Sequence, residues 1–347
     1  GCAAPAASTS GPAPAASTGA TASSGTSGGK GTVTVVTHDS FALSKDVLAS
    51  FTAQTGYELK TVAQGDAGAM VNQLILTKDA PLGDAVFGID NTFASRAISA
   101  GILAPYASPK LPADAAGLKA DDSGSLTPTD FGDVCVNADK QWFAAKNLAL
   151  PKTLDDLTKP AYKGLLVVEH AGSSSPGLAF LAATVAAKGQ PGYLDYWGQL
   201  KANGVKVVKG WTEAYSTEFT GGEGKGKYPL VVSYSSSPAF TLTADGKATT
   251  TASLDATCFR QVEYAGVLAG AKNPEGAKAF VDWMLSNGVQ ADIPGSMYMY
   301  PAVTSTPLPA EWDTFGPLAP KPYTLTAAEL GAGRDQWIKD WSAKVVG

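Results

Sequence analysis

Short runs of β-branched residues alternate with apolar helical segments from residue 32 onward, and this alternation constrains the fold more than any other feature of the chain. Residues 32–37, 57–62 and 85–89 have the composition of strands. A helix is predicted between the first two, with Ser44 as its N-cap and Gly56 just past its end. Strands that alternate with helices in this way form a parallel sheet with helices on its faces, so the sequence predicts an α/β fold.

The same alternation continues in the second half of the chain. Further strands are predicted at 165–169, 205–208 and 230–234, and further helices at 177–188, at 277–285 with Gly288 as the stop, and around Trp337 and Trp341. The spacing of these elements is irregular, whereas a single (β/α)8 barrel is built from even units. Two doubly wound lobes therefore fit the pattern better than one barrel.

Composition excludes several classes of protein. The chain has 347 residues, of which 44% are hydrophobic and 16% charged, so it can bury the cores of two lobes. Lys and Arg together number 26 against 31 Asp and Glu, which gives a net charge of -5. A nucleic-acid-binding protein normally presents a basic face, and this balance argues against that class. No apolar run approaches the ~20 residues that a membrane span requires.

The first thirty residues differ in kind from the rest. Residues 1–30 consist of Gly, Ala, Ser, Thr and Pro apart from Cys2 and Lys30. Such a segment has too little apolar surface to offset the entropy of ordering it, so we expect a flexible tether. The Gly1-Cys2 start resembles the processing site of bacterial lipoproteins, which implies a lipid on Cys2 and anchoring to the cell membrane. The alternative is an ordinary cysteine.

Cysteine and histidine are too scarce for a typical metal site. Cys135 and Cys258 lie far apart in the sequence, no CxxC motif exists, and His38 and His170 are the only histidines. In an exported protein the even pair of cysteines suggests one long-range disulfide bond. Two buried free thiols are the alternative.

Aromatic, hydroxyl and acidic residues gather in the loops that follow the predicted strands. Ligands of open α/β sheets bind at the carboxyl ends of the strands. The residues found there include His38, Asp90, Ser174, Ser175, Trp211, Tyr215, Tyr234 and Tyr298. Aromatic faces enclose flat rings and attract cations, and a carboxylate accepts hydrogen bonds from an exocyclic amine. A flat cationic heterocycle with a polar tail fits this set, whereas any one ring taken alone is better explained by core packing.

Six motifs in collinear order carry a resemblance to a known family. They are Thr37-His38-Asp39-Ser40-Phe41, Gly88-Ile89-Asp90-Asn91, Ser174-Ser175-Pro176-Gly177-Leu178, Gly210-Trp211-Thr212-Glu213-Ala214-Tyr215, Ser233-Tyr234-Ser235-Ser236-Ser237-Pro238-Ala239 and Met299-Tyr300-Pro301. Together they resemble the thiamine-binding proteins that supply bacterial ABC transporters, from about residue 33 to the C-terminus. The resemblance implies a two-lobed, type II-like periplasmic-binding-protein fold, each lobe a mostly parallel sheet flanked by helices, with the ligand in a cleft between lobes.

The resemblance also implies a role and a domain plan. The protein would bind thiamine or a thiamine phosphate without chemistry, use no cofactor, act as a monomer and pass its ligand to ABC permease subunits. The expected boundaries are 1–30 for the tether, 31–130 for the first part of lobe 1, 131–262 for lobe 2, and 263–347 for a return to lobe 1, with the packing of 306–347 left open.

Roles for individual residues follow from the same resemblance. Asp90 matches the acidic residue that binds the aminopyrimidine of the ligand. Trp211, Tyr215 and Tyr234 match aromatic positions of the second lobe that stack on rings or contact phosphate, and Ser174 and Ser175 match its hydroxyl-bearing turn.

Three positions depart from the family pattern. His38 stands where Tyr is expected and Tyr298 where Trp is frequent, and both keep a ring for stacking. Gly172 replaces a larger basic residue, which favours free thiamine over its phosphate esters.

Two other functions are alternatives to this one. A receptor of the same fold for another ligand, such as ferric iron, is the first alternative, although Tyr298 and Tyr300 are not adjacent as the paired tyrosines of iron receptors are. A serine hydrolase that uses the 173–175 turn is the second, although the turn fails the G-x-S-x-G pattern. Residues 221–227 satisfy G-x-x-x-x-G-K, but Tyr228 follows in place of Ser or Thr, so a solvated loop is favoured over a phosphate-binding loop.

Overall fold

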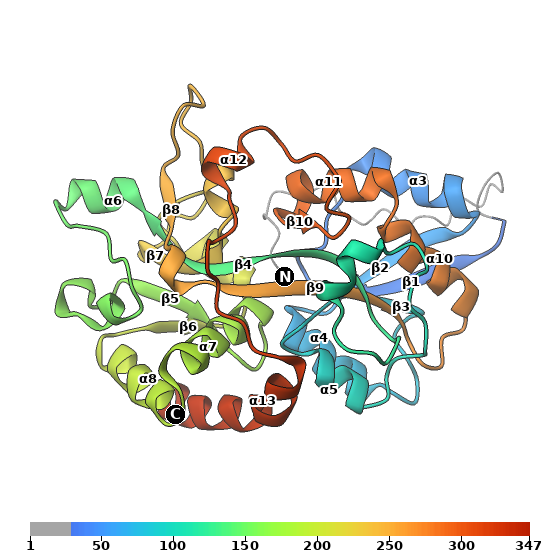
Figure 1. Ribbon diagram of the computed structural model, residues 1–347, viewed down its shortest axis with the longest axis horizontal. Helices are drawn as coiled ribbons and strands as arrows, with labels where there is room; N and C mark the ends of the chain where they lie inside the picture. The colour runs from blue at the N-terminus through green and yellow to red at the C-terminus, as the bar shows by residue number, and fades with distance from the viewer. Residues whose placement is uncertain (1–28) are drawn as a thin grey trace. The chain divides into compact units, whose positions relative to one another are not determined.

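The computed structural model describes residues 29–347, which divide into two compact units (Figure 1). Of the described residues, the first unit contains 29–131 and the segment Val262–Pro309, and the second contains Gly132–Gln261 and Ala310–Gly347. The chain therefore passes between the units after Phe131, after Gln261 and after Pro309. Cys2 and the tether predicted at 1–30, except its last two residues, lie outside the described residues.

The sheet of the first unit is parallel at its start and antiparallel at its end. Its strands are β1 (Thr32–Thr37), β2 (Glu58–Ala63), β3 (Ala85–Asp90), β4 (Thr127–Asp139), β9 (Phe259–Val267) and β10 (Tyr300–Pro301), of which β4 and β9 continue into the second unit. The order is β2-β1-β3-β9-β4, with β10 also paired to β4. Strands β1, β2 and β3 run parallel, whereas β9 is antiparallel to β3.

Helices cover this sheet in two groups (Figure 1). They are α3 (Lys45–Thr55), α4 (Ala67–Leu76), α5 (Ala94–Ser99), α10 (Pro274–Met284) and α11 (Asn287–Met297), with a 3-10 helix η1 (Ala113–Leu118). Helices α3, α10 and α11 pack together, while α4 and α5 pack on β3. Ser44 precedes α3 as predicted, but its hydroxyl donates to Asp292 Oδ1 at 2.5 Å instead of capping the helix.

The second unit has the order β4-β7-β5-β6. Its further elements are β5 (Leu166–Glu169), β6 (Lys206–Val208), β7 (Leu230–Tyr234), β8 (Thr251–Ser253), α6 (Lys140–Ala145), α7 (Ser175–Lys188), α8 (Gly192–Ala202), α9 (Trp211–Glu213), α12 (Trp312–Phe315) and α13 (Ala327–Trp341). Short 3-10 and π helices are η2 (Asp155–Thr158), η3 (Pro160–Tyr162), η4 (Ala214–Glu218), η5 (Ser237–Phe240), η6 (Asp255–Thr257) and η7 (Ser342–Val346). Helix α7 is buried on all sides from Ser175 to Val185 and forms the core of the unit.

The elements predicted from the sequence are present, with two differences. Residues 310–347 belong to the second unit, not to a return into the first, because the segment before α13 pairs beside β9: the N–H of Tyr323 donates to the carbonyl of Cys258 and the N–H of Arg260 to that of Tyr323. Helix α10 ends at Met284, and Gly288 lies inside α11 instead of stopping the preceding helix.

A disulfide bond joins Cys135 to Cys258 in the second unit. Both residues are fully buried, Cys135 on β4 and Cys258 directly before β9, and they pack with Ala319. The bond therefore ties together the two long strands and the C-terminal segment that lies beside them.

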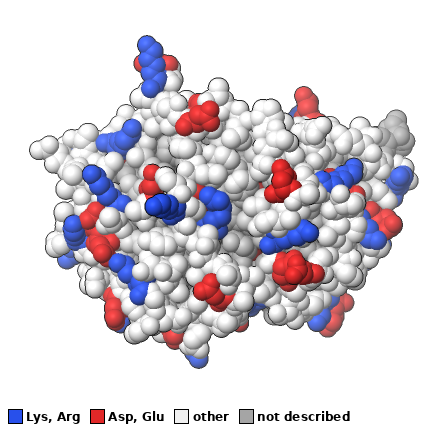
Figure 2. Space-filling view, viewed as in Figure 1, with Lys and Arg blue, Asp and Glu red and all other residues white. Residues whose placement is uncertain are grey.

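The surface carries charges of both signs. On the face shown in Figure 2, acidic and basic side chains are interspersed. Among residues 29–347, no helix has the length and apolar character needed to cross a bilayer.

Candidate ligand-binding site

Asp90 ends β3 in the first unit, and its carboxylate is held by the turn that follows. The side chain is fully buried. Its Oδ1 accepts hydrogen bonds from the backbone N–H of Thr92 at 3.2 Å, from that of Phe93 at 3.1 Å, and from the Thr92 hydroxyl at 2.7 Å. This turn leads into α5 and fixes the carboxylate at the carboxyl end of a parallel strand, where open α/β sheets hold their ligands.

His38 follows β1 and is fully buried beside β3 and β9. Its Nε2 lies 3.0 Å from Oε2 of Glu263, and its Nδ1 accepts the backbone N–H of Ser40 at 3.1 Å. Because Nδ1 accepts a hydrogen bond, this pattern assigns the ring proton to Nε2. The ring also packs against Phe87, with centroids 5.3 Å apart.

Asp130 and Glu263 form a buried carboxyl pair next to His38. Asp130 lies on β4 and Glu263 on β9, and neither is exposed. Burial, then the negative charge of Glu263 and a hydrogen bond to it, raise the pKa of Asp130 well above its ordinary value of 3.8. Burial raises the pKa of Glu263, whereas His38 and the hydrogen bond from Asp130 lower it. Asp130 thus keeps the proton of the pair.

Tyr298 caps the C-terminal end of α11 in a left-handed backbone conformation. Its φ is 59° and its ψ is 33°, and its side chain is half-buried. A residue with a side chain pays for this conformation in strain, and such residues concentrate at functional sites. Tyr300, two residues on, pairs with Phe131 of β4 and packs on its ring at 5.6 Å.

Three aromatic rings form a continuous stack in the second unit. Trp211 and Tyr215 have centroids 5.0 Å apart and an interplanar angle of 11°, and Tyr215 stacks on Phe219 at 5.5 Å. Trp211 Nε1 donates to the hydroxyl of Ser233 at 3.0 Å. The stack is carried by α9 and the π-helix η4, which keep residues four apart on one face. Helices of the π type are rare and recur at functional sites.

The glycine-rich loop 221–227 packs on this π-helix. A Cβ added to Gly224 would lie 2.1 Å from the carbonyl oxygen of Phe219, so only glycine fits there. The N–H of Gly226 donates to that same carbonyl, and the N–H of Tyr228 donates to Glu218. The loop leads into β7 and opens no helix, so its glycines serve close packing against the aromatic stack instead of a phosphate.

Tyr234 and the serine turn lie in the second unit with the stack. The Tyr234 hydroxyl donates to Gln261 at 2.7 Å, and its backbone N–H donates to Ser237, whose hydroxyl lies 2.8 Å from that of Ser233. Trp211 and Tyr234 are thereby linked through two serines. Ser174 caps α7 by accepting the N–H of Gly177 at 3.1 Å, and Ser175 is the first residue of that helix.

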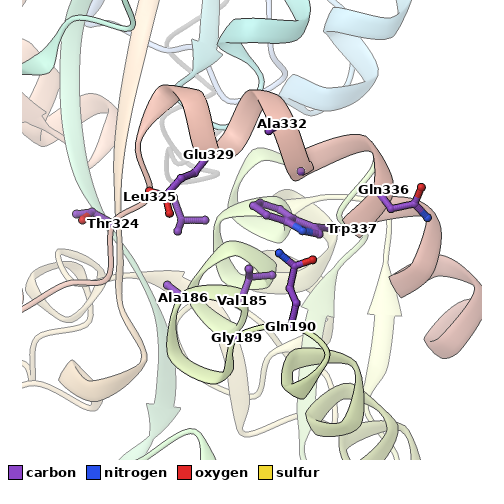
Figure 3. A pocket seen from close by; sticks show the side chains of 11 residues that line it. Val185, Ala186, Gly189, Gln190, Thr324, Leu325, Glu329, Ala332, Gln336 and Trp337 are labelled. Atoms are coloured by element: carbon purple, nitrogen blue, oxygen red, sulfur yellow. The ribbon is translucent and has the colours of Figure 1, made fainter.

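A cavity of about 770 Å³ lies elsewhere in the second unit, between the end of α7 and α13 (Figure 3). Val185 and Gln190, on the side of α7, face Trp337 of α13 across it, and Gln336 also lines it. None of the residues predicted from the sequence to bind ligand lines this cavity. In the part of the chain from residue 29 on, no group of three or more His, Cys, Asp and Glu is placed to hold a metal ion.

The structure places five of the predicted residues in two groups, whereas Ser174 and Ser175 lie at the start of α7 and Tyr298 at the end of α11. Asp90 and His38 lie in the first unit on neighbouring strands, and Trp211, Tyr215 and Tyr234 are linked in the second. The sequence reasoning missed Phe219, Glu263, Asp130 and Gln261. Phe219 was detectable, because it continues the four-residue spacing of Trp211 and Tyr215. The other three depend on cross-strand pairing, which leaves no local signal in the sequence.

Known proteins resemble this chain over most of its length. Residues 83–314 match the family of bacterial extracellular solute-binding proteins. The thiamine-binding periplasmic protein of Escherichia coli (strain K12) is 31% identical over 325 residues, which cover 91% of this chain and 94% of that protein. A solved periplasmic thiamin binding protein superposes with a TM-score of 0.78 at 31% identity, covering 90% of this chain and 96% of that one.

More distant solved structures share the fold alone. A ferric binding protein from Campylobacter jejuni superposes with a TM-score of 0.71 at 16% identity, covering 90% of this chain and 99% of that one. These similarities confirm the predicted α/β periplasmic-binding-protein fold with two compact units. The match to the family over residues 83–314, together with 31% identity to a periplasmic relative, shows that this chain belongs to the bacterial extracellular solute-binding proteins.

Proposed function

We propose that this protein is an extracytoplasmic receptor that binds thiamine, or one of its phosphate esters, and delivers it to the permease of an ABC transporter. The observation that carries the proposal is the 31% identity to the thiamine-binding periplasmic protein of Escherichia coli over 91% of the chain. The receptor leaves its ligand chemically unchanged and needs no cofactor.

The chemistry of the predicted residues supports this ligand. Thiamine joins an aminopyrimidine to a positively charged thiazolium ring. Trp211 and Tyr215 offer aromatic faces, each worth roughly 0.5–2 kcal/mol to a flat cation when desolvated. Asp90 offers a carboxylate already oriented by Thr92 and Phe93, which suits the exocyclic amine of the pyrimidine.

The remaining predicted residues suit the other parts of the ligand. Tyr234, Ser174 and Ser175 are proposed to contact its hydroxyethyl or phosphate tail, and Tyr298 to supply a further ring. Gly172 places no cation in the turn before α7, so we propose that free thiamine is preferred over its esters. His38 is proposed to act indirectly, as argued below.

The place of the protein in the cell follows from its family and its first residues. Its relatives are named as periplasmic proteins. We propose that this chain also works outside the cytoplasm, as a monomer, and that a lipid on Cys2 anchors it to the membrane. Mass spectrometry of the protein isolated from its own host tests the anchor, since an acylated Cys2 shifts the mass of the N-terminal peptide.

The two alternatives have less support. The ferric binding protein from Campylobacter jejuni resembles this chain at 16% identity, which speaks for a shared fold and not for a shared ligand. A serine hydrolase needs a free nucleophile, yet Ser173 donates to the carbonyl of Lys209 and Ser174 caps α7. Neither is proposed.

Isothermal titration calorimetry of the refolded, ligand-free chain tests the function. Thiamine is expected to bind with a stoichiometry of one, and thiamine monophosphate and diphosphate more weakly. Oxythiamine, in which an oxygen replaces the exocyclic amine, is the matched control and is expected to bind more weakly than thiamine. Heat on addition of ferric citrate with none on addition of thiamine would overturn the proposal.

A further inference from the structure

We propose that His38 is a positioning residue for Asp90, and that it acts through Gly88 and Glu263 instead of stacking on the ligand. This inference rests on the proposed function only for its ligand readout. His38 stands where a tyrosine is expected. It therefore affects the ligand indirectly, through Asp90, and does not contact the ligand itself.

Both ring nitrogens of His38 are already engaged within the first unit. Nδ1 accepts from Ser40 at 3.1 Å, and Nε2 donates to Glu263 at 3.0 Å. The ring is fully buried, with one side against Phe87. The ring lies against Phe87 and the backbone of Gly88, and it has no unused nitrogen to offer a ligand.

The ring also fixes the strand that carries Asp90. Gly88 has a φ of 109°, and a Cβ added to it would lie 2.2 Å from Cδ2 of His38, so the ring rests on the bare backbone of β3. The pairing of β3 with β9 shifts register between Phe87 and Ile89, at this same glycine. Such a bulge changes the direction in which the following side chains point. His38 therefore packs on the bulge that sets the direction of Asp90.

The second attachment of His38 holds the neighbouring strand. Glu263, which accepts from Nε2, is the register partner of Asp90 across β3 and β9. The buried ring of His38 thus contacts β3 at Gly88, two residues before Asp90, and β9 at Glu263, directly opposite Asp90. Of the two attachments, the hydrogen bond to Glu263 is the one that holds β9 beside the bulge, so its loss frees the bulge and the carboxylate then loses its alignment with the N–H groups of Thr92 and Phe93.

Two substitutions separate positioning from stacking. His38→Phe keeps a flat ring and removes both nitrogens, whereas His38→Gln removes the ring and keeps an N–H donor near the place of Nε2. If His38 positions Asp90, the Gln variant retains most of the thiamine affinity and the Phe variant loses about tenfold, the cost of a hydrogen bond to a charged group. If His38 stacks on the ligand, the ranking reverses.

A ligand-free readout makes the test independent of the proposed function. The amide ¹H–¹⁵N resonances of Thr92 and Phe93 report the hydrogen bonds to Asp90. They are expected to shift in His38→Phe and to stay close to their wild-type positions in His38→Gln, and any other ranking overturns the inference. Urea unfolding of both variants verifies that they fold. A wild-type protein that fails to bind thiamine would refute the function alone, since these resonances still decide the role of His38.

Discussion

Buried aspartates of the first unit show how one residue type takes different tasks according to its partners. Asp84 precedes β3 and accepts the N–H groups of Thr34 and Asn273 at 2.8 and 2.9 Å, so it joins β1 to the start of α10. Asp90 ends the same strand and accepts N–H groups from its own turn. Asp130 has a carboxylate as its neighbour and therefore holds a proton.

Asp90→Asn is expected to weaken thiamine binding by about 10–100-fold, because a charge-assisted hydrogen bond is worth roughly 1.5–3 kcal/mol. The variant should also lose the preference for thiamine over oxythiamine, because the carboxylate that accepts a hydrogen bond from the exocyclic amine is absent. Calorimetry with both ligands measures the two effects. Asp84→Asn is the matched control at the opposite end of β3: it should lower stability and leave affinity unchanged. Equal affinity of Asp90→Asn and wild type would remove Asp90 from the site.

Asp130→Asn is expected to change how stability depends on pH. An ordinary aspartate releases its proton near pH 3.8, whereas buried Asp130 keeps it to a higher pH. The folded protein therefore binds a proton that the unfolded chain has lost, and its stability falls as pH rises through this interval. Asparagine stays neutral and still donates a hydrogen bond to Glu263, so the stability of the variant should fall less steeply as the pH rises. Urea unfolding between pH 5 and pH 9 measures the slope, and parallel curves would contradict the shared proton.

Some site residues are readable from the sequence because their position follows from local pattern. Asp90 ends one predicted strand and Trp211 follows another, and open α/β sheets bind ligands at such strand ends. His38 is different. Its location after β1 was predictable, but its burial against Gly88 and its bond to Glu263 depend on a bulge and on a strand 225 residues away, and neither leaves a local trace.

At the scale of elements, the π-helix η4 and the loop 221–227 behave as one structure. The rings of Trp211, Tyr215 and Phe219 stack along the helix, and the glycines of the loop approach its carbonyl groups too closely for a side chain. The loop that resembled a phosphate-binding motif therefore supports an aromatic wall. Close packing explains Gly224 and Gly226, and a left-handed backbone conformation explains Gly222.

Gly224→Ala is expected to destabilise the protein by about 1–3 kcal/mol, the usual cost of forcing extra volume into a packed site. The added Cβ pushes the loop away from Phe219 and loosens the stack, so thiamine affinity should fall as well. Urea unfolding and calorimetry measure the two changes. Gly288→Ala in α11 is the control, because its Cβ meets nothing within 4 Å and alanine favours a helix. A Gly224→Ala variant with wild-type stability and wild-type thiamine affinity would show that the loop is not needed to hold the aromatic stack.

Regular elements were predictable and long polar strands were not. Strands β1, β3 and β7 are dense in β-branched and apolar residues, which is the signal that propensity reasoning uses. Strand β4 contains Pro128, Asp130, Asp133 and Asn137, all of which disfavour strands in isolation. Tertiary partners stabilise it instead: Arg260 pairs with Asp133, and Asn137 donates to the carbonyls of Cys135 and Tyr234.

At the scale of the whole molecule, the disulfide bond closes a loop of 123 residues that contains most of the second unit. Replacing both cysteines, Cys135→Ala with Cys258→Ala, is expected to cost about 2–5 kcal/mol of stability through the greater freedom of the unfolded chain. Urea unfolding with and without reductant measures the loss. The stability of the double variant should not depend on reductant, whereas the stability of the wild type should fall to nearly that of the double variant once the disulfide bond is reduced. Equal stability of the two oxidised proteins would show that the bond contributes nothing.

The interrupted layout of the first unit has a consequence for the order of events at the ribosome. Strand β3 is complete at Asp90, but its neighbour β9 enters the unit only at Val262, after the entire 132–261 insertion has been synthesised. Until then one edge of β3 has no native strand beside it. The first unit therefore has all of its residues only once Pro309 has been made, and the second only once α13 has followed, so neither unit can finish folding before the segments after Gln261 emerge.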